Sequence, residues 1–192
     1  PAMVFAEDAE KFARGLSLPQ FDDALKVAGG HAGPGMITFD SLLAGTADIR
    51  AARDAVTPQT LAKILFTSGS TSTPKGVPQT HHMLCVNQNQ YSGCLPFLKA
   101  RPPVILSWLP WNHVFAGNSN FNMALAFGGA LYLDTGKPVK GLFDTTLENL
   151  RMVKHTMSAN VPVGYAMLVE AMREDAQLRH NFFADLDLIF YA

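Results

Sequence analysis

Short apolar runs alternate with longer amphipathic stretches along this chain, and the alternation predicts an α/β fold, a layered sheet with flanking helices. The apolar runs predict strands at 3–6, 25–28, 63–66, 104–109, 130–133, 160–163 and 186–192. The stretches with helical spacing predict helices at 7–18, 38–43, 80–91, 113–127, 145–156 and 165–173, and a helix or turn at 178–183.

Helical spacing also predicts which side chains of two of these helices face the core. They are Phe39, Leu42 and Leu43 in the first helix, and Leu147, Leu150, Met152 and Val153 in the second. A polar connection at 47–60 contains Thr57 followed by Pro58, which predicts a helix start. We expect an upstream layer in residues 1–56 and a second layer in residues 57–192.

Composition narrows the class of protein. The chain has 192 residues, of which 48% are hydrophobic, enough for one sizeable core or for part of a larger domain. With 15 basic and 16 acidic residues, it gives no reason to expect nucleic acid or a membrane surface as a partner. The longest apolar run, 123–133, is shorter than the roughly 18 residues that a spanning helix needs. Two cysteines without paired spacing and no basic leader predict a cytoplasmic protein.

A loop rich in hydroxyls and glycine follows the predicted strand 63–66. It reads Thr67-Ser68-Gly69-Ser70-Thr71-Ser72-Thr73-Pro74-Lys75-Gly76. Hydroxyls and backbone N–H groups in a tight turn form a nest for anions, and a lysine adds a charge that suits phosphate. The common P-loop ends in Gly-Lys-Ser/Thr and opens a helix, whereas here Lys75 precedes an extended Val77. The loop therefore predicts a different kind of polyphosphate site.

The order of this loop resembles the phosphate loop of the adenylate-forming enzymes, which include acyl-CoA synthetases, luciferases and peptide-synthetase adenylation domains. The resemblance implies that Thr67, Ser68, Gly69, Ser70, Thr71 and Lys75 hold the phosphates of ATP. It implies a catalytic role for Lys75, and a part for Thr71 in holding Mg²⁺ through the phosphates. It also places the two predicted layers in the large N-terminal domain of that fold.

A second block, Leu109-Pro110-Trp111-Asn112-His113, follows the predicted strand 104–109. By the same resemblance, His113 lies beside the carboxylate that is activated, and Phe115, Asn118 and Ser119 line the acid pocket. An α-helix beginning near His113 would put Phe115, Ser119 and Asn122 or Met123 on one face. Asn112, Asn118, Asn120 and Asn122 either bind the oxygens of an aromatic acid or face solvent and cap the helix.

Within the superfamily the chain most resembles the feruloyl-CoA synthase family. The resemblance is carried by the segments 108–113, 121–122, 131–138, 160–165, 182–184 and 188–191. It implies that a hydroxycinnamate such as ferulate is converted with ATP to an acyl adenylate and then to a thioester with coenzyme A. The partners it implies are the carboxylic acid, ATP and CoA, with protein groups mainly positioning them and neutralising charge.

The chain departs from the family pattern in two ways. Ser72 stands where the family usually has glycine, and a left-handed serine costs roughly 1 kcal/mol. The adenine turn, the Thr-Glu block, the ribose aspartate and the C-terminal lysine of the family are not found after Ala192. We therefore expect an internal piece of a larger synthetase, inactive alone and prone to self-association.

Other functions remain open on the sequence. A fatty acyl-CoA synthetase, another adenylating enzyme or a non-catalytic phosphate-binding module would share the loop. A serine hydrolase is disfavoured because no Gly-x-Ser-x-Gly elbow occurs. A metal bound by His81, His82 and Cys85 is disfavoured because structural zinc usually takes four ligands.

Overall fold

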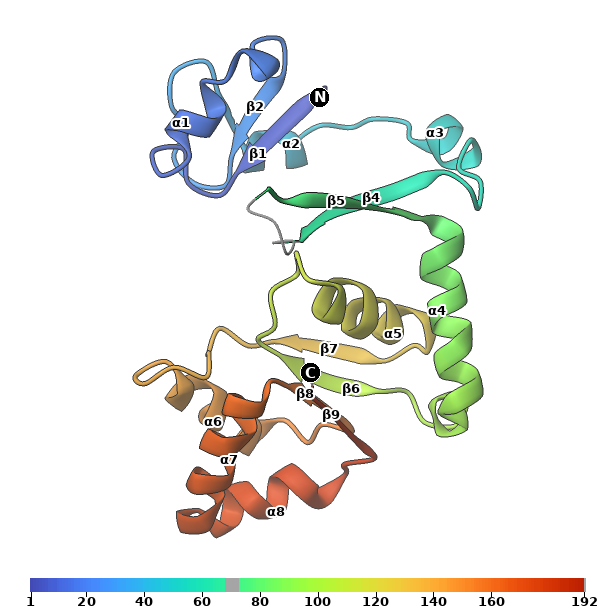
Figure 1. Cartoon of the computed structure of the whole chain (residues 1–192), viewed down its shortest axis with the longest axis vertical. Coiled ribbons are helices and arrows are strands. Elements are labelled where there is room, and N and C mark those ends of the chain that lie inside the picture. The colour runs from blue at the N-terminus through green and yellow to red at the C-terminus, as the bar shows by residue number, and fades with distance from the viewer. Residues whose placement is uncertain (68–72, 192) are drawn as a thin grey trace. The chain divides into compact units, whose positions relative to one another are not determined.

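The computed structural model describes residues 1–67 and 73–191, which fall into two units, Pro1–Val56 and Thr57–Ala192. The first unit contains a three-stranded parallel sheet in the order β1-β2-β3, of which Figure 1 labels β1 and β2. Its strands are β1 (Met3–Ala6), β2 (Leu25–Ala28) and β3 (Ile37–Thr38). Its helices are α1 (Ala13–Leu16), a 3-10 turn at Pro19–Phe21, α2 (Phe39–Leu43) and α3 (Arg50–Asp54). The strands predicted at 3–6 and 25–28 are confirmed.

The helix predicted at 7–18 is wrong in its extent, because only its last turn is helical. Asp8 Oδ1 accepts hydrogen bonds of 3.0 Å from the backbone N–H groups of Glu10 and Lys11 and holds the segment in a turn. The helix predicted at 38–43 is confirmed, with Thr38 as its N-cap. Its predicted inward face is not, because Leu43 is 69% exposed in this unit.

The second unit begins with a hairpin of two antiparallel strands, β4 (Leu61–Thr67) and β5 (Lys75–Thr80). The predicted strand is therefore confirmed, and so is the extended backbone after Lys75. The register shifts between Leu61 and Lys63, which leaves Ala62 as the extra residue of a β-bulge. The helix start predicted at Thr57 is wrong, because Thr60 Oγ1 accepts from the backbone N–H of Thr57 at 2.9 Å and closes a turn.

Four parallel strands form the sheet of the second unit in the order β7-β6-β8-β9 (Figure 1). They are β6 (Val104–Ser107), β7 (Ala130–Leu133), β8 (Met157–Asn160) and β9 (Leu188–Tyr191). The chain runs from β6 to one neighbour and then crosses to the other, so the strand order reverses between β6 and β8. Ligands of open α/β sheets bind outside the carboxyl ends of the strands at such a point.

The strand predicted at 160–163 is displaced. The structure puts β8 at Met157–Asn160, and Pro162 opens the next helix. All four residues of β8 are buried, yet two of them, Ser158 and Asn160, are polar. An apolar pattern therefore missed the strand and moved it to the apolar residues that follow.

The helices of the second unit pack beside these strands. They are α4 (His81–Cys94), a 3-10 helix at Pro96–Lys99, a π-helix at Phe115–Asn120, α5 (Phe121–Ala126), α6 (Phe143–Met152), α7 (Pro162–Glu174) and α8 (Ala176–Ala184). The predicted helices are thus present, with boundaries that differ by several residues. Within the part of the chain that the structure describes, no helix has the length and apolar character to cross a membrane.

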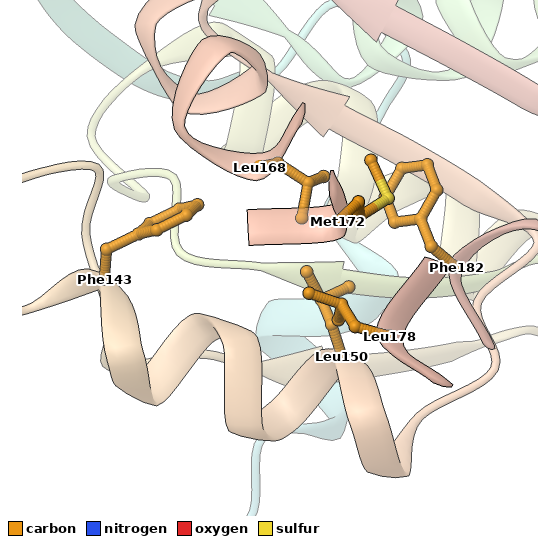
Figure 2. Close-up of a cluster of buried hydrophobic side chains, with 6 residues drawn as sticks. All are labelled: Phe143, Leu150, Leu168, Met172, Leu178 and Phe182. Carbon is orange, nitrogen blue, oxygen red and sulfur yellow. The ribbon is translucent and has the colours of Figure 1, made fainter. Parts of the chain in front are cut away.

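The main core of this unit lies where three helices meet. Phe143 and Leu150 of α6, Leu168 and Met172 of α7, and Leu178 and Phe182 of α8 pack as one buried cluster (Figure 2). Leu150 faces inward as predicted, but Met152 is 73% exposed because α6 ends there and the chain turns away. A second cluster of Leu98, Ile105, Met123 and Met157 fills the space between α5 and the sheet.

Candidate functional site

The hairpin brings together the two described ends of the predicted phosphate loop. Thr67 is the last residue of β4, Lys75 is the first residue of β5, and the two are register partners. Both side chains are exposed. Ser68, Gly69, Ser70 and Thr71, predicted to hold phosphate, and Ser72, predicted to be strained, lie outside the described residues. A hydroxyl and an ammonium group thus stand at the mouth of the loop, where an anion would meet both.

His113 lies in the segment that follows β6, ahead of the π-helix. Its Nδ1 accepts a hydrogen bond of 3.2 Å from the backbone N–H of Phe115, and its carbonyl accepts one of 2.9 Å from the N–H of Gly117. Because Nδ1 is an acceptor, the neutral ring carries its proton on Nε2. The residue is exposed, so Nε2 is a hydrogen-bond donor that a carboxylate could reach from solvent.

The segment after His113 winds as a π-helix before it becomes α5. This winding changes the predicted face, because an i to i+5 pattern does not keep residues four apart in line. Phe115 packs with the cluster of Leu109, Ala116 and Ala159. Ser119 instead exchanges a hydrogen bond of 3.0 Å with the hydroxyl of Tyr91 on α4. The structure therefore gives Phe115 and Ser119 different neighbours.

Two of the four asparagines have protein partners. Asn118 Nδ2 donates to Gln79 Oε1 at 2.8 Å, and Asn120 Nδ2 donates to Ser107 Oγ at 3.1 Å. Asn112 is exposed and Asn122 is half-buried. The amide donors of Asn118 and Asn120 thus hold the π-helix to β5 and β6, which is a structural role that the sequence alone left open.

The carboxyl ends of β6 and β8 are joined by side chains. Trp108, the residue after β6, donates from Nε1 to Asn160 Oδ1 at 3.1 Å, and the same oxygen accepts from the N–H of Val161 at 2.8 Å. A methyl group on Gly164 would overlap the Asn160 amide, whose Cγ lies 2.6 Å from the Cβ position. These contacts fix the edge of the sheet where the strand order reverses.

Asp134 closes the loop after β7 and was not singled out by sequence reasoning. Its buried carboxylate accepts from the N–H of Gly136 at 2.8 Å, from Thr146 Oγ1 at 2.7 Å and from Asn149 Nδ2 at 2.9 Å. All three donors are neutral and belong to the chain itself. The spacing of an aspartate two residues before a glycine at a strand end is the signal that could have indicated this turn.

Two aromatic rings, Trp111 and Phe121, and the cationic Lys63 lie near the segment that follows β6. Trp111 and Phe121 stack at a tilt with their ring centroids 4.9 Å apart, and Trp111 remains 48% exposed. They line a cavity of about 240 Å³ with Leu125, Leu131 and Leu133. Lys63 of β4 donates from Nζ to the carbonyl of Gly117 at 3.3 Å, and burial lowers the pKa of this lysine. The arrangement can bind anions at the hairpin and a carboxylate near His113.

Comparisons with known proteins identify the family and the fold of the chain. A family model described as AMP-binding enzyme matches residues 5–190. The long chain acyl-CoA synthetase 6 of Arabidopsis thaliana is 30% identical over 130 residues, which cover 66% of this chain and 17% of that protein. The long-chain-fatty-acid–CoA ligase ACSBG2 of Gallus gallus is 29% identical over 118 residues, covering 60% of this chain and 15% of that protein. The chain thus spans about a sixth of the length of these relatives.

Solved structures share the fold. The ATP-bound MatB of Rhodopseudomonas palustris superimposes with a TM-score of 0.71 at 19% identity, over 100% of this chain and 35% of that one. The anthranilate CoA ligase AuaEII, in complex with anthranoyl-AMP, gives a TM-score of 0.71 at 17% identity, over 95% of this chain and 34% of that one. The predicted α/β class, with a layered sheet and flanking helices, is therefore confirmed.

Proposed function

The chain belongs to the AMP-binding enzyme family, and from this we propose that it is part of an ATP-dependent ligase that joins a carboxylic acid to coenzyme A. In this proposal the carboxylate attacks the α-phosphorus of ATP, pyrophosphate leaves, and the thiol of CoA then displaces AMP from the acyl adenylate. The observation that carries the proposal is the register pairing of Thr67 with Lys75 at the mouth of the loop.

The hairpin supplies the nucleotide side of the proposed site. Lys75 neutralises charge on the β- and γ-phosphates, and Thr67 donates its hydroxyl to them. We propose that the loop residues between them, Ser68, Gly69, Ser70 and Thr71, also bind the phosphates. Residues 1–67 and 73–191 contain no cluster of three or more His, Cys, Asp or Glu side chains suited to a metal. We propose that Mg²⁺ is held through the phosphates, with a contribution from Thr71.

The segment after β6 supplies the acid side. His113 Nε2 donates to a carboxylate oxygen and holds it for attack, while its Nδ1 is occupied by the N–H of Phe115. We propose a hydroxycinnamate such as ferulate as the acid, supported by the resemblance of 108–113, 131–138 and 160–165 to feruloyl-CoA synthases. Phe115, Asn118 and Ser119 are the proposed pocket residues.

A long-chain fatty acid is the second candidate. Two observations favour it: the curated relatives named above are long-chain acyl-CoA ligases, and the donors of Asn118 and Asn120 are engaged within the protein. A pocket with fewer free amides suits an aliphatic chain better than a substituted phenol.

Acid-dependent exchange between ATP and pyrophosphate tests these proposals. The protein that contains this chain and the isolated chain are assayed side by side with ferulate, coumarate, benzoate and palmitate. Exchange with the hydroxycinnamates alone supports the aromatic acid, and exchange with palmitate alone supports the second candidate. The isolated chain is expected to be silent in both cases. Absence of exchange with every acid, in the protein that contains the chain, overturns the ligase proposal.

Two further properties belong to the same proposal. We propose a cytoplasmic location, which fractionation with a cytoplasmic marker tests. We also propose that the isolated chain self-associates, because β9 ends the strand order of its sheet and leaves Tyr191 75% exposed. Sedimentation of the isolated chain over a range of concentrations tests this, and a single monomeric species at all concentrations would contradict it.

A further inference from the structure

A cross-strand pair of the hairpin reaches two consecutive residues of the π-helix. Lys63 of β4 and Gln79 of β5 are register partners. Lys63 Nζ donates to the carbonyl of Gly117 at 3.3 Å, and Gln79 Oε1 accepts from Asn118 Nδ2 at 2.8 Å. One partner donates and the other accepts, so the pair joins the π-helix through two complementary contacts.

The register explains how Lys63 shares a face with the mouth of the loop. The pairing of Lys63 with Gln79 continues the register of Thr67 with Lys75, and the bulge at Ala62 lies before it, so Lys63 and Thr67, four residues apart, point to the same face of the hairpin. A lysine on an edge strand would normally extend its ammonium group into water. Here the side chain is half-buried and its ammonium group donates to a backbone carbonyl. Removing part of the charge from water costs free energy, which indicates a structural role for this lysine.

The same two elements carry the two halves of the proposed site. The hairpin bears Thr67 and Lys75 at its far end, four residues along β4 from Lys63, which is roughly 13 Å at strand spacing. The π-helix begins two residues after His113. The pairs from Lys63 and Gln79 to Thr67 and Lys75 are continuous in register, so we expect a shift of the nucleotide end to move Lys63 and Gln79 as well.

The contacts of the π-helix with α4 are separate from the pair. Gln88 Nε2 donates to the carbonyl of Asn118 at 3.2 Å, and Tyr91 bonds to Ser119 at 3.0 Å. These contacts join the same segment to α4. Gln88 Oε1 and Asn118 Oδ1 are buried and find no hydrogen-bond partner among the described residues. Buried acceptors without a partner call for a specific explanation, and both of these lie where the hairpin and α4 meet the π-helix.

We propose that Lys63 and Gln79 are a positioning pair that couples nucleotide binding at the hairpin to acid binding beside the π-helix. The inference rests on the proposed function. Nucleotide held by Thr67 and Lys75 fixes the hairpin, and the pair in turn fixes residues 117 and 118 and the segment that carries His113. Because such coupling is reciprocal, bound acid strengthens nucleotide binding by the same factor.

Hydrogen exchange tests whether the contacts of Lys63 and Gln79 hold the π-helix in place, and it needs no bound carboxylic acid. Lys63→Met removes the donor and keeps the aliphatic stem, and Gln79→Leu removes the acceptor. In the protein that contains this chain, we expect the double variant to exchange the amides of residues 113–121 about three- to tenfold faster. Lys63→Arg retains a donor and is expected to stay near the unchanged protein, as is Lys99→Met at an exposed lysine. Equal exchange in the double variant overturns the proposal.

Binding measurements test the coupling. The dissociation constant of the acid is measured by calorimetry with and without a non-hydrolysable ATP analogue. We expect the analogue to tighten acid binding at least fivefold in the unchanged protein, and less than twofold in the double variant. A fivefold effect retained in the double variant overturns the coupling. If neither ferulate nor palmitate binds the unchanged protein, the proposed function and the coupling both fail. The hydrogen-exchange result still decides whether Lys63 and Gln79 hold the π-helix in place.

Discussion

Trp108 donates a hydrogen bond of 3.1 Å from Nε1 to Asn160 Oδ1, which joins the residue after β6 to the last residue of β8. The pair stands where the order of the parallel strands reverses. Asn160 Oδ1 also accepts from the N–H of Val161, so one oxygen holds both the loop after β6 and the start of α7. The edge on which the proposed acid site depends is therefore set by a single amide.

Asn160→Ala is expected to destabilise the protein by about 1–3 kcal/mol, because the Trp108 and Val161 donors lose their shared acceptor in a buried place. Urea unfolding measures the loss. Asn112→Ala removes the same side chain at an exposed position and is expected to change the free energy of unfolding by less than about 0.5 kcal/mol. Equal effects of the two variants would contradict this role of Asn160.

Gly164→Ala is expected to destabilise the protein, because the added methyl group overlaps the Asn160 amide. Combining it with Asn160→Ala removes the clash, so the double variant is expected to lose less than the sum of the two single losses. Gly93→Ala is the matched control in α4, where a Cβ meets no described atom within 4 Å. That change is expected to stabilise by up to about 1 kcal/mol. Thermal unfolding of the four variants would reveal strict additivity, which would argue against the clash.

His155 predicts a dependence of stability on pH. Its ring is buried against Phe182, neither nitrogen has a hydrogen-bond partner among the described residues, and burial lowers its pKa to about 4. The unfolded chain, with a pKa near 6.5, takes up the proton first as pH falls. The free energy of unfolding therefore has its full value above pH 6.5, and protonation of His155 in the unfolded chain lowers it by about 3 kcal/mol between pH 6.5 and pH 4.

The comparison that isolates this effect is His155→Leu, which is expected to remove the extra loss of stability between pH 6.5 and 4. His180→Leu changes an exposed histidine of α8 and should retain the loss. Unfolding curves at half-unit pH intervals provide the measurement. Parallel curves for the unchanged protein and His155→Leu would show that the folded protein protonates His155 as easily as the unfolded chain.

Lys75→Met is expected to lower ATP–pyrophosphate exchange by about 100-fold, because the β- and γ-phosphates lose a positive charge in the transition state. The side chain is exposed at the start of β5, so the melting temperature should hardly change. Lys137→Met is the control at another exposed lysine of the same unit, with exchange expected within about twofold of the unchanged protein. Similar activity of both variants would remove Lys75 from the proposed site.

Several strands could be predicted because they are continuous apolar runs. The runs at 25–28 and 130–133 became β2 and β7 with unchanged limits. β8 could not be found in this way, because its buried Ser158 and Asn160 satisfy their polar groups through Tyr165 and Trp108. The pattern of a sequence does not show that a polar residue has a buried partner far along the chain.

The candidate site was predictable to the extent that it depends on local order. Thr67 and Lys75 flank the loop in the sequence as they flank it in the hairpin. The pocket face was not predictable, because the expected spacing assumed an α-helix and the segment winds as a π-helix. The contacts of Lys63 and Gln79 with the π-helix were equally hidden, since they join residues 54 and 39 positions apart in the sequence.

The extra residue of the bulge, Ala62, makes the hairpin sensitive to the number of residues before Lys63. Side chains of a strand alternate between faces, and Lys63 keeps the register of the pairs up to Thr67 and Lys75, so the extra residue decides on which face Leu61 enters the hairpin from the turn at Thr57. Deleting Ala62, which contributes only a methyl group, would turn that incoming chain to the opposite face. The presence of a residue at position 62 thus matters more for the pairing of the strands than which residue it is.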